Sequence, residues 1–195
     1  MATSTALETT QVVDETHSLL SVINLSIGFR QDSVEFQAVK NISFNLAAGR
    51  FTAIVGESGS GKSVTALSML QLLPSQAVVN GSLLFNRPGG NLLDITKATK
   101  EEIQKVRGNE IAMIFQEPMT SLNPVFTCGN QVMESLILHK NISRQEAKDQ
   151  TIALFEQVEL PHPAQMLNRY PHQLSGGQKQ RVMIAMAMSC NPALL

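Results

Sequence analysis

A glycine-rich loop between two apolar segments constrains this chain more than any other feature. Residues 51–55 form a short, almost entirely apolar run, which predicts a strand buried on both faces of a sheet. Residues 56–63 follow with the pattern G-x-x-x-x-G-K-S. Apolar residues then recur at helical spacing as far as Leu73, until Pro74 ends the pattern. The sequence therefore predicts a strand, a glycine loop and a helix in direct succession.

This loop has the residues that a polyphosphate site requires. Glycines let backbone N–H groups curl around an anion, and a helix that begins there adds the positive end of its dipole. Lys62 is placed to reach the outer phosphates, and the Ser63 hydroxyl is small enough to join a Mg²⁺ shell. We therefore expect a nucleoside triphosphate as the ligand. A flexible loop without a ligand is the competing interpretation.

A second helix start with glycines lies at residues 174–178, Leu-Ser-Gly-Gly-Gln. Ser175 and Gln178 have the spacing of a capping box, and the two glycines between them bare the N–H groups of the first helical turn. Such a segment could hold a second phosphate. Taken alone, it is explained equally well as a capped helix that follows a loop.

Composition and charge exclude several classes of protein. The 195 residues are 43% hydrophobic and 16% charged, which is typical of a globular chain of one domain with an appendage. Fifteen Lys and Arg residues against sixteen Asp and Glu give a net charge of −1, which argues against sequence-independent nucleic-acid binding. The longest apolar stretch, residues 182–190, is well short of the roughly 18 residues expected of a membrane span.

Neither the cysteines nor the histidines suggest a metal site. Cys128 and Cys190 lie far apart in the sequence, so buried thiols are expected and not a disulfide framework. The histidines lack the spacing and the acidic neighbours of metal ligands or general bases, and we expect structural or solvated roles for all four. They are His17, His139, His162 and His172.

Periodicity divides the rest of the chain. Residues 1–17 have neither a basic start nor an apolar core, so they predict a disordered tail and not a signal peptide. Alternating residues from Ser18 onward predict antiparallel strands, and the apolar run 111–115 predicts a second buried strand. Capping boxes are expected at Thr99/Glu102 and Ser143/Glu146. The predicted helices cover a short segment ended by Gly108, then 129–139, 145–158 and 177–190.

These motifs together resemble the ATP-binding subunits of ABC transporters. The resemblance rests on a Walker A loop at residues 56–63, a Q-loop glutamine at Gln116 and a signature at 174–178, in the order that the family has. Residues 114–124 and 169–173 are similar to those of the importers of dipeptides, oligopeptides, nickel and glutathione. The likeness covers residues 18–195.

The resemblance implies an α/β fold: a P-loop NTPase (RecA-like) core with an antiparallel β subdomain and a helical subdomain at about 117–170, incomplete at the C-terminus. It also implies a function for particular residues. Those expected to bind ATP are Phe29, Gly56, Glu57, Ser58, Gly59, Ser60, Gly61, Lys62, Ser63 and Gln116. Of these, Phe29 would stack on adenine, although a phenylalanine in a strand serves equally well as core. Ser63 and Gln116 would help to hold Mg²⁺. The signature residues, expected to face the ATP of a partner, are Leu174, Ser175, Gly176, Gly177 and Gln178.

The family's partners and location follow from the same resemblance. A second ABC ATPase domain would pack head to tail, with two nucleotides between the domains. Two membrane permease subunits would dock on the helical subdomain, a solute-binding protein would act indirectly, and nucleic acid would not be a partner. The implied activity is ATP hydrolysis that powers solute import at the cytoplasmic face of the inner membrane, to which the protein would be bound peripherally.

One part of the family pattern is missing from these residues. The family's Walker B aspartate and catalytic glutamate follow an apolar strand after the signature helix, and this sequence stops at residues 193–195, as that strand would begin. Because hydrolysis needs placed Mg²⁺ and an oriented water, we expect little catalysis from these residues alone. A catalytically inactive nucleotide-binding remnant and an ABC ATPase without a transporter are the alternative interpretations.

Overall fold

The computed structural model describes residues 18–31, 34–116 and 121–195. The tail expected at residues 1–17 lies outside them. The chain divides into two compact units, Met1–Ile103 and Gln104–Leu195. Each unit is described by itself below. None of the described helices is long and apolar enough to cross a bilayer.

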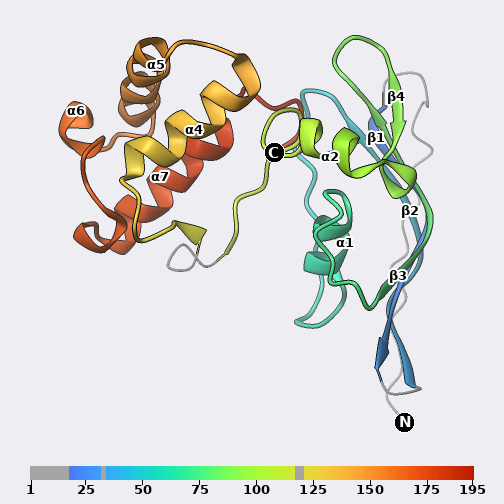
Figure 1. The fold of residues 1–195 in the computed structure, drawn as a ribbon. Coiled ribbons are helices and arrows are strands. Elements are labelled where there is room, and N and C mark those ends of the chain that lie inside the picture. Colours follow the sequence, from blue (N-terminus) through green and yellow to red (C-terminus); the bar gives the residue numbers. More distant parts are fainter. Residues whose placement is uncertain (1–17, 32–33, 117–120) are drawn as a thin grey trace. The chain divides into compact units, whose positions relative to one another are not determined.

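An antiparallel sheet forms the first unit (Figure 1). Its strands are β1 (Ser18–Gln31), β2 (Val34–Ala47), β3 (Ala77–Asn86) and β4 (Leu92–Asp94), in the order β2-β1-β3-β4. The antiparallel strands expected from residue 18 onward are confirmed by β1 and β2, whose register pairs Val22 with Phe44.

A bulge in β1 keeps its apolar side chains on one face. The register of β1 shifts between Val22 and Leu25, and Asn24 there has a φ of 49°. Because of that shift, Val22 and Leu25 are both buried although they are three residues apart. On β3, Gly81 faces the bulge with a φ of +98°, and a Cβ at Gly81 would lie 2.6 Å from the Asn24 carbonyl oxygen. The sheet therefore needs a glycine at this position.

Helix α1 (Lys62–Ser68) begins directly after the glycine loop, as the sequence predicts, but it is shorter than expected. The apolar pattern runs to Leu73, whereas turns replace the helix after Ser68. The backbone of Gln71 has a φ of 49°. Its side-chain amide donates hydrogen bonds to the carbonyl oxygens of Ile95 and Ala98. Those residues belong to the 3-10 helix η2 (Ile95–Lys97) and its C-cap, so tertiary contacts end α1 before the sequence pattern does.

The prediction of buried strands at residues 51–55 and 111–115, made from their apolar runs alone, is wrong. Residues 51–55 form no strand, and Phe51 and Val55 are 109% and 72% exposed. At 111–115 only Ile111 is paired, by isolated parallel bridges to Arg107 and Leu194. An apolar run becomes a buried strand only when strands flank it, and the described residues supply no such neighbours to 51–55.

Helices form the second unit. They are α2 (Lys100–Val106), which crosses the boundary between the units, α4 (Cys128–Lys140), α5 (Arg144–Gln157), α6 (Pro163–Met166), the 3-10 helix η3 (Pro171–Gln173) and α7 (Gly176–Met188). Figure 1 shows α4 and α7 side by side, with α5 beside them. Phe155, Leu136 and Val182 lie in their common core.

Local capping chemistry sets where these helices begin. Thr99 and Glu102 exchange backbone-to-side-chain hydrogen bonds at the start of α2, and Ser143 and Glu146 do so at α5, which confirms both expected capping boxes. The Ser143 hydroxyl and backbone N–H lower the pKa of the Glu146 carboxyl. The cysteines are buried thiols, as expected.

Candidate functional site

The glycine loop of the first unit folds around the ammonium group of Lys62. Lys62 Nζ donates hydrogen bonds to the carbonyl oxygens of Gly56, at 2.8 Å, and Glu57, at 2.7 Å. It also lies 3.3 Å from Ser60 Oγ. The predicted pattern therefore forms a closed loop with a cation at its centre.

Two glycines shape this loop in different ways. Gly59 has a φ of +84° with open space around a would-be Cβ, so only its backbone conformation favours glycine. Gly61, at a φ of +91°, lies against β2, and a Cβ there would be 2.7 Å from the Ala38 carbonyl oxygen. That close approach places the start of α1 against the sheet. A larger residue at Gly61 would push the loop away from β2.

The first turn of α1 offers donors to an anion. No side chain caps this helix at Gly61, and Ser63 in the same turn is exposed. Thr65 stabilises this first turn, because its N–H and its hydroxyl both donate to the Gly61 carbonyl oxygen, at 2.8 and 3.0 Å. The sequence analysis did not single out Thr65. The arrangement suits a polyphosphate, which needs backbone donors and a cation together.

The segment 174–178 begins α7 in the second unit. Ser175 Oγ accepts from the backbone N–H of Gln178 at 3.3 Å, and Gln178 Oε1 accepts from the backbone N–H of Ser175 at 3.0 Å. This is the capping box that the sequence predicts. Leu174 is buried at 8% exposure and fixes the segment to the helical core.

The two glycines of this segment are not explained by packing inside the unit. Gly176 and Gly177 are exposed, neither has a positive φ, and a Cβ on either would meet no atom within 4 Å. Alanine would favour the helix at these positions. Their bare backbone is therefore available to a group from outside the unit.

Two other residues expected to bind ATP, Phe29 and Gln116, lie outside the glycine loop. Phe29 lies half-buried in β1, paired with Phe36 of β2 and Ala77 of β3. Gln116 is exposed after the 111–115 segment. Ser63 belongs to the first unit and Gln116 to the second, so their joint role at Mg²⁺ stays a prediction. A hydroxyl and an amide oxygen are the hard ligands that Mg²⁺ accepts. Among the described residues, no group of three or more His, Cys, Asp or Glu side chains could hold a metal ion.

Arg181 of α7 has a role that sequence reasoning missed. Its Nη1 donates to the carbonyl oxygens of Val158, at 3.1 Å, and Glu159, and it lies 3.5 Å from the Glu159 carboxylate. Val158 and Glu159 directly follow the last residue of α5, where backbone carbonyl oxygens lack helical hydrogen-bond partners. In the turn after α5, the backbone of Glu159 has a positive φ of 55°. No pattern in the sequence predicts this conformation.

Comparison with known proteins identifies the family of this chain. A family model described as "ABC transporter" matches residues 39–195. The chain belongs to the ABC transporter family. The matched range includes residues 56–63 and 174–178, and their roles as Walker A loop and signature stay predictions.

Two curated relatives of this ABC domain carry the name glutathione import ATP-binding protein GsiA. Those of Shigella dysenteriae and Escherichia coli are each 51% identical over 180 residues. The match takes in 91% of this chain and 29% of each relative. The ABC domain described here thus spans less than a third of the length of these relatives.

Solved structures show the same fold. A dimeric post-hydrolysis state of the ATP-binding cassette MJ0796, bound to ADP and Pi, superposes with a TM-score of 0.76 and 28% identity over 89% of this chain and 70% of that one. A second dimeric MJ0796 structure gives a TM-score of 0.74 at 28% identity over the same shares. The fold is therefore that of an ABC ATPase, a mixed α/β fold with an antiparallel sheet. That part of the expected fold class is confirmed.

Proposed function

We propose that this chain is the ATP-binding part of an ATPase that powers the import of a peptide-type solute, of the glutathione class, by an ABC transporter. The observation that carries the proposal is the loop 56–63, which surrounds the Lys62 ammonium with its own carbonyl oxygens. The 51% identity to glutathione import proteins supports the solute class.

We assign the loop's glycines and Lys62 to the triphosphate. When ATP binds, the Lys62 ammonium would exchange the Gly56 and Glu57 carbonyl oxygens for phosphate oxygens, which are stronger acceptors for a cation. Ser63 and Gln116 would hold Mg²⁺, which neutralises charge on the outer phosphates, and Phe29 would stack on adenine.

Residues 174–178 would contact the ATP of a partner cassette. The bare surface over Gly176 and Gly177 supports this role, because it leaves backbone N–H groups open to a phosphate from another molecule. The dimeric MJ0796 structures show that cassettes of this fold pair with one another. A head-to-tail dimer with two nucleotides between its domains is the assembly that we propose.

Membrane permease subunits would dock on the helical subdomain, at about residues 117–170. Three large apolar side chains of that region support the docking: Val125, Phe126 and Leu138 are 71%, 52% and 73% exposed. Exposed apolar groups of this size are typical of interaction surfaces. The protein would then lie at the cytoplasmic face of the inner membrane, where a solute-binding protein acts through the permeases.

Calorimetric titration with Mg-ATP tests the nucleotide site. Replacement of Lys62 by alanine should weaken ATP binding by at least about 100-fold, since a charge-assisted contact to phosphate is lost. The matched control is Lys140→Ala, which removes an exposed lysine at the end of α4. Equal affinity of the Lys62→Ala variant and the unmodified chain would contradict the assignment of the loop.

The importer assignment needs a separate measurement. Co-purification of the chain with the permease pair of a glutathione-type importer is expected, and Leu138→Glu should abolish the association without altering ATP affinity. Association that survives this substitution would place the docking surface elsewhere.

A further inference from the structure

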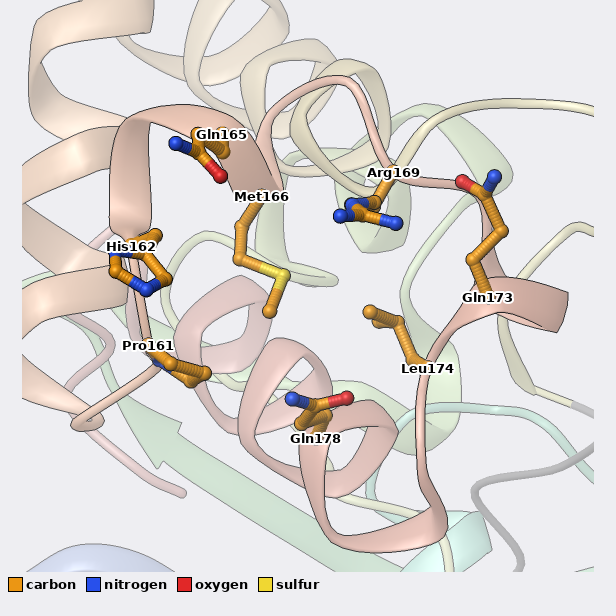
Figure 2. A pocket seen from close by; sticks show the side chains of 8 residues that line it. All are labelled: Pro161, His162, Gln165, Met166, Arg169, Gln173, Leu174 and Gln178. Carbon is orange, nitrogen blue, oxygen red and sulfur yellow. The ribbon is translucent and has the colours of Figure 1, made fainter.

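A pocket opens beside the signature segment, within the second unit. Its volume is about 230 Å³, and it lies between α6, the turn that follows α6 and the first turn of α7 (Figure 2). In Figure 2 the side chains of Arg169, Met166, Leu174 and Gln178 converge on this one space. None of the residues that line it is acidic.

The polar side of the pocket presents a cation and an amide donor. No described residue offers the Arg169 guanidinium a hydrogen bond or an ion pair, so its five N–H donors are open to a ligand. The Gln178 side chain uses its oxygen to accept from the Ser175 N–H, which leaves the NH₂ group as the polar group that it can offer. These donors favour an anion over a cation.

The backbone beneath Arg169 is held in place. The Arg169 carbonyl oxygen accepts from the N–H of Cys128 at 2.8 Å, and the Leu167 carbonyl accepts from the N–H of Gly129 at 3.2 Å. Both donors are first-turn groups of α4 without helical partners. A Cβ at Gly129 would lie 2.7 Å from Leu167, so the two segments are in direct contact. The guanidinium therefore extends from a fixed part of the chain.

An apolar surface adjoins these donors. Met166 and Leu174 are each 8% exposed, and Pro161 completes the apolar lining. A single guanidinium balances one negative charge, and its planar fork matches a carboxylate. Pockets for drug-sized ligands measure about 300–1,000 Å³, so a pocket of about 230 Å³ suits a smaller molecule.

We propose that this pocket binds a small organic monocarboxylate, whose carboxylate lies on Arg169 and Gln178 and whose short apolar chain lies on Met166 and Leu174. All the residues of this site belong to the second unit, and binding there is proposed not to depend on ATP. Because Gln178 also caps the signature helix, the bound carboxylate contacts the side chain that fixes the start of α7.

Nuclear magnetic resonance on the isotope-labelled chain tests this site, with butyrate as the probe and butyramide as its uncharged counterpart. Butyrate should produce saturable shifts of the Arg169 Nε–H and Gln178 NH₂ signals, and of the Ser175 backbone N–H. Butyramide should bind at least tenfold more weakly. Shifts that do not saturate, or equal binding of the two probes, would overturn the proposal.

Two substitutions that each remove one positive charge distinguish binding in the pocket from general attraction of anions to the protein. Arg169→Gln should weaken butyrate at least tenfold, whereas Arg144→Gln, on the exposed face of α5, should leave it unchanged. Arg169→Lys keeps the charge without the planar fork and should give an intermediate affinity. Unaltered affinity in Arg169→Gln, or equal losses in both glutamine variants, would refute the site. All spectra are recorded without nucleotide, so failure of the proposed ATP function leaves this test interpretable.

Discussion

At the scale of single residues, glycine has three different uses in this chain. Gly61 is required by a close approach, Gly59 by its backbone conformation alone, and Gly177 by neither. The third case is the informative one for function, because a glycine that nothing inside the unit requires costs helix stability. We therefore propose that the bare surface over Gly176 and Gly177 serves a contact with a group outside the unit.

Gly177→Ala should stabilise the chain. Alanine is favoured over glycine in a helix by up to about 1 kcal/mol, and the added methyl group meets open space. We expect a rise in Tm of about 1–4 °C, measured by circular dichroism. The same variant should weaken nucleotide-dependent association with an intact cassette. A fall in Tm would show that the glycine has a structural role after all.

The buried thiol of Cys128 should be inert in the folded chain. Burial raises its pKa to about 11, and its side chain is 0% exposed. Thiolate is the reactive species, so a folded pKa near 11 leaves about 0.1% thiolate at pH 8, against about a quarter for an ordinary cysteine. In a Cys190→Ser background, Ellman's reagent should modify Cys128 at least about 100-fold more slowly than in denaturant. Similar rates in the two conditions would contradict the buried placement.

At the scale of elements, local chemistry was predictable from the sequence and long-range pairing was not. The capping boxes at Thr99, Ser143 and Ser175 were recognised correctly because both partners lie within four residues of each other. The strand expected at residues 51–55 was wrong, because its burial depends on neighbouring strands and not on its own apolarity. Strand β3 was not expected at all, since Gly81 interrupts its pattern and serves the bulge of β1 instead.

The same division holds for the candidate site. The glycine loop could be recognised because its whole pattern lies within eight consecutive residues, and in the structure Lys62 donates to the loop's own carbonyl oxygens. The role of Arg181 could not be recognised, because its acceptors, just after the end of α5, are 22 and 23 residues away in the sequence.

A pair of glycine substitutions tests the bulge that aligns β1 with β3. Gly81→Ala combines a φ of +98° with a Cβ placed 2.6 Å from the Asn24 carbonyl oxygen. Gly89→Ala, in the turn before β4, has a similar φ of +104° but open space around the Cβ. We expect a loss of about 1 kcal/mol for Gly89→Ala and at least about 3 kcal/mol for Gly81→Ala, measured by urea unfolding. Equal losses would mean that the contact with β1 relaxes freely.

At the scale of the whole molecule, the apolar segments 51–55 and 111–115 expose large apolar side chains outside any helix or sheet. Phe51, Val55 and Phe115 are 109%, 72% and 46% exposed. Among the described residues, the strand-like pairing of these segments is limited to the two parallel bridges of Ile111. In the bridge to Leu194, the Ala112 N–H donates to the Leu194 carbonyl oxygen at 2.9 Å. Unpaired apolar backbone of this kind is a template for association with other chains.

The chain should therefore self-associate and bind the dye ANS. Sedimentation at increasing protein concentration is expected to show growing oligomers, because exposed apolar segments of several chains can pair. Phe51→Lys and Phe115→Lys should each reduce both dye binding and oligomer size, since a charge in the segment opposes pairing. Leu138→Lys removes a side chain that is 73% exposed on the well-formed helix α4, and it should have the smaller effect because its backbone is already paired within the helix. An equal or larger effect of Leu138→Lys would mean that separate apolar side chains, and not the unpaired segments, drive the association.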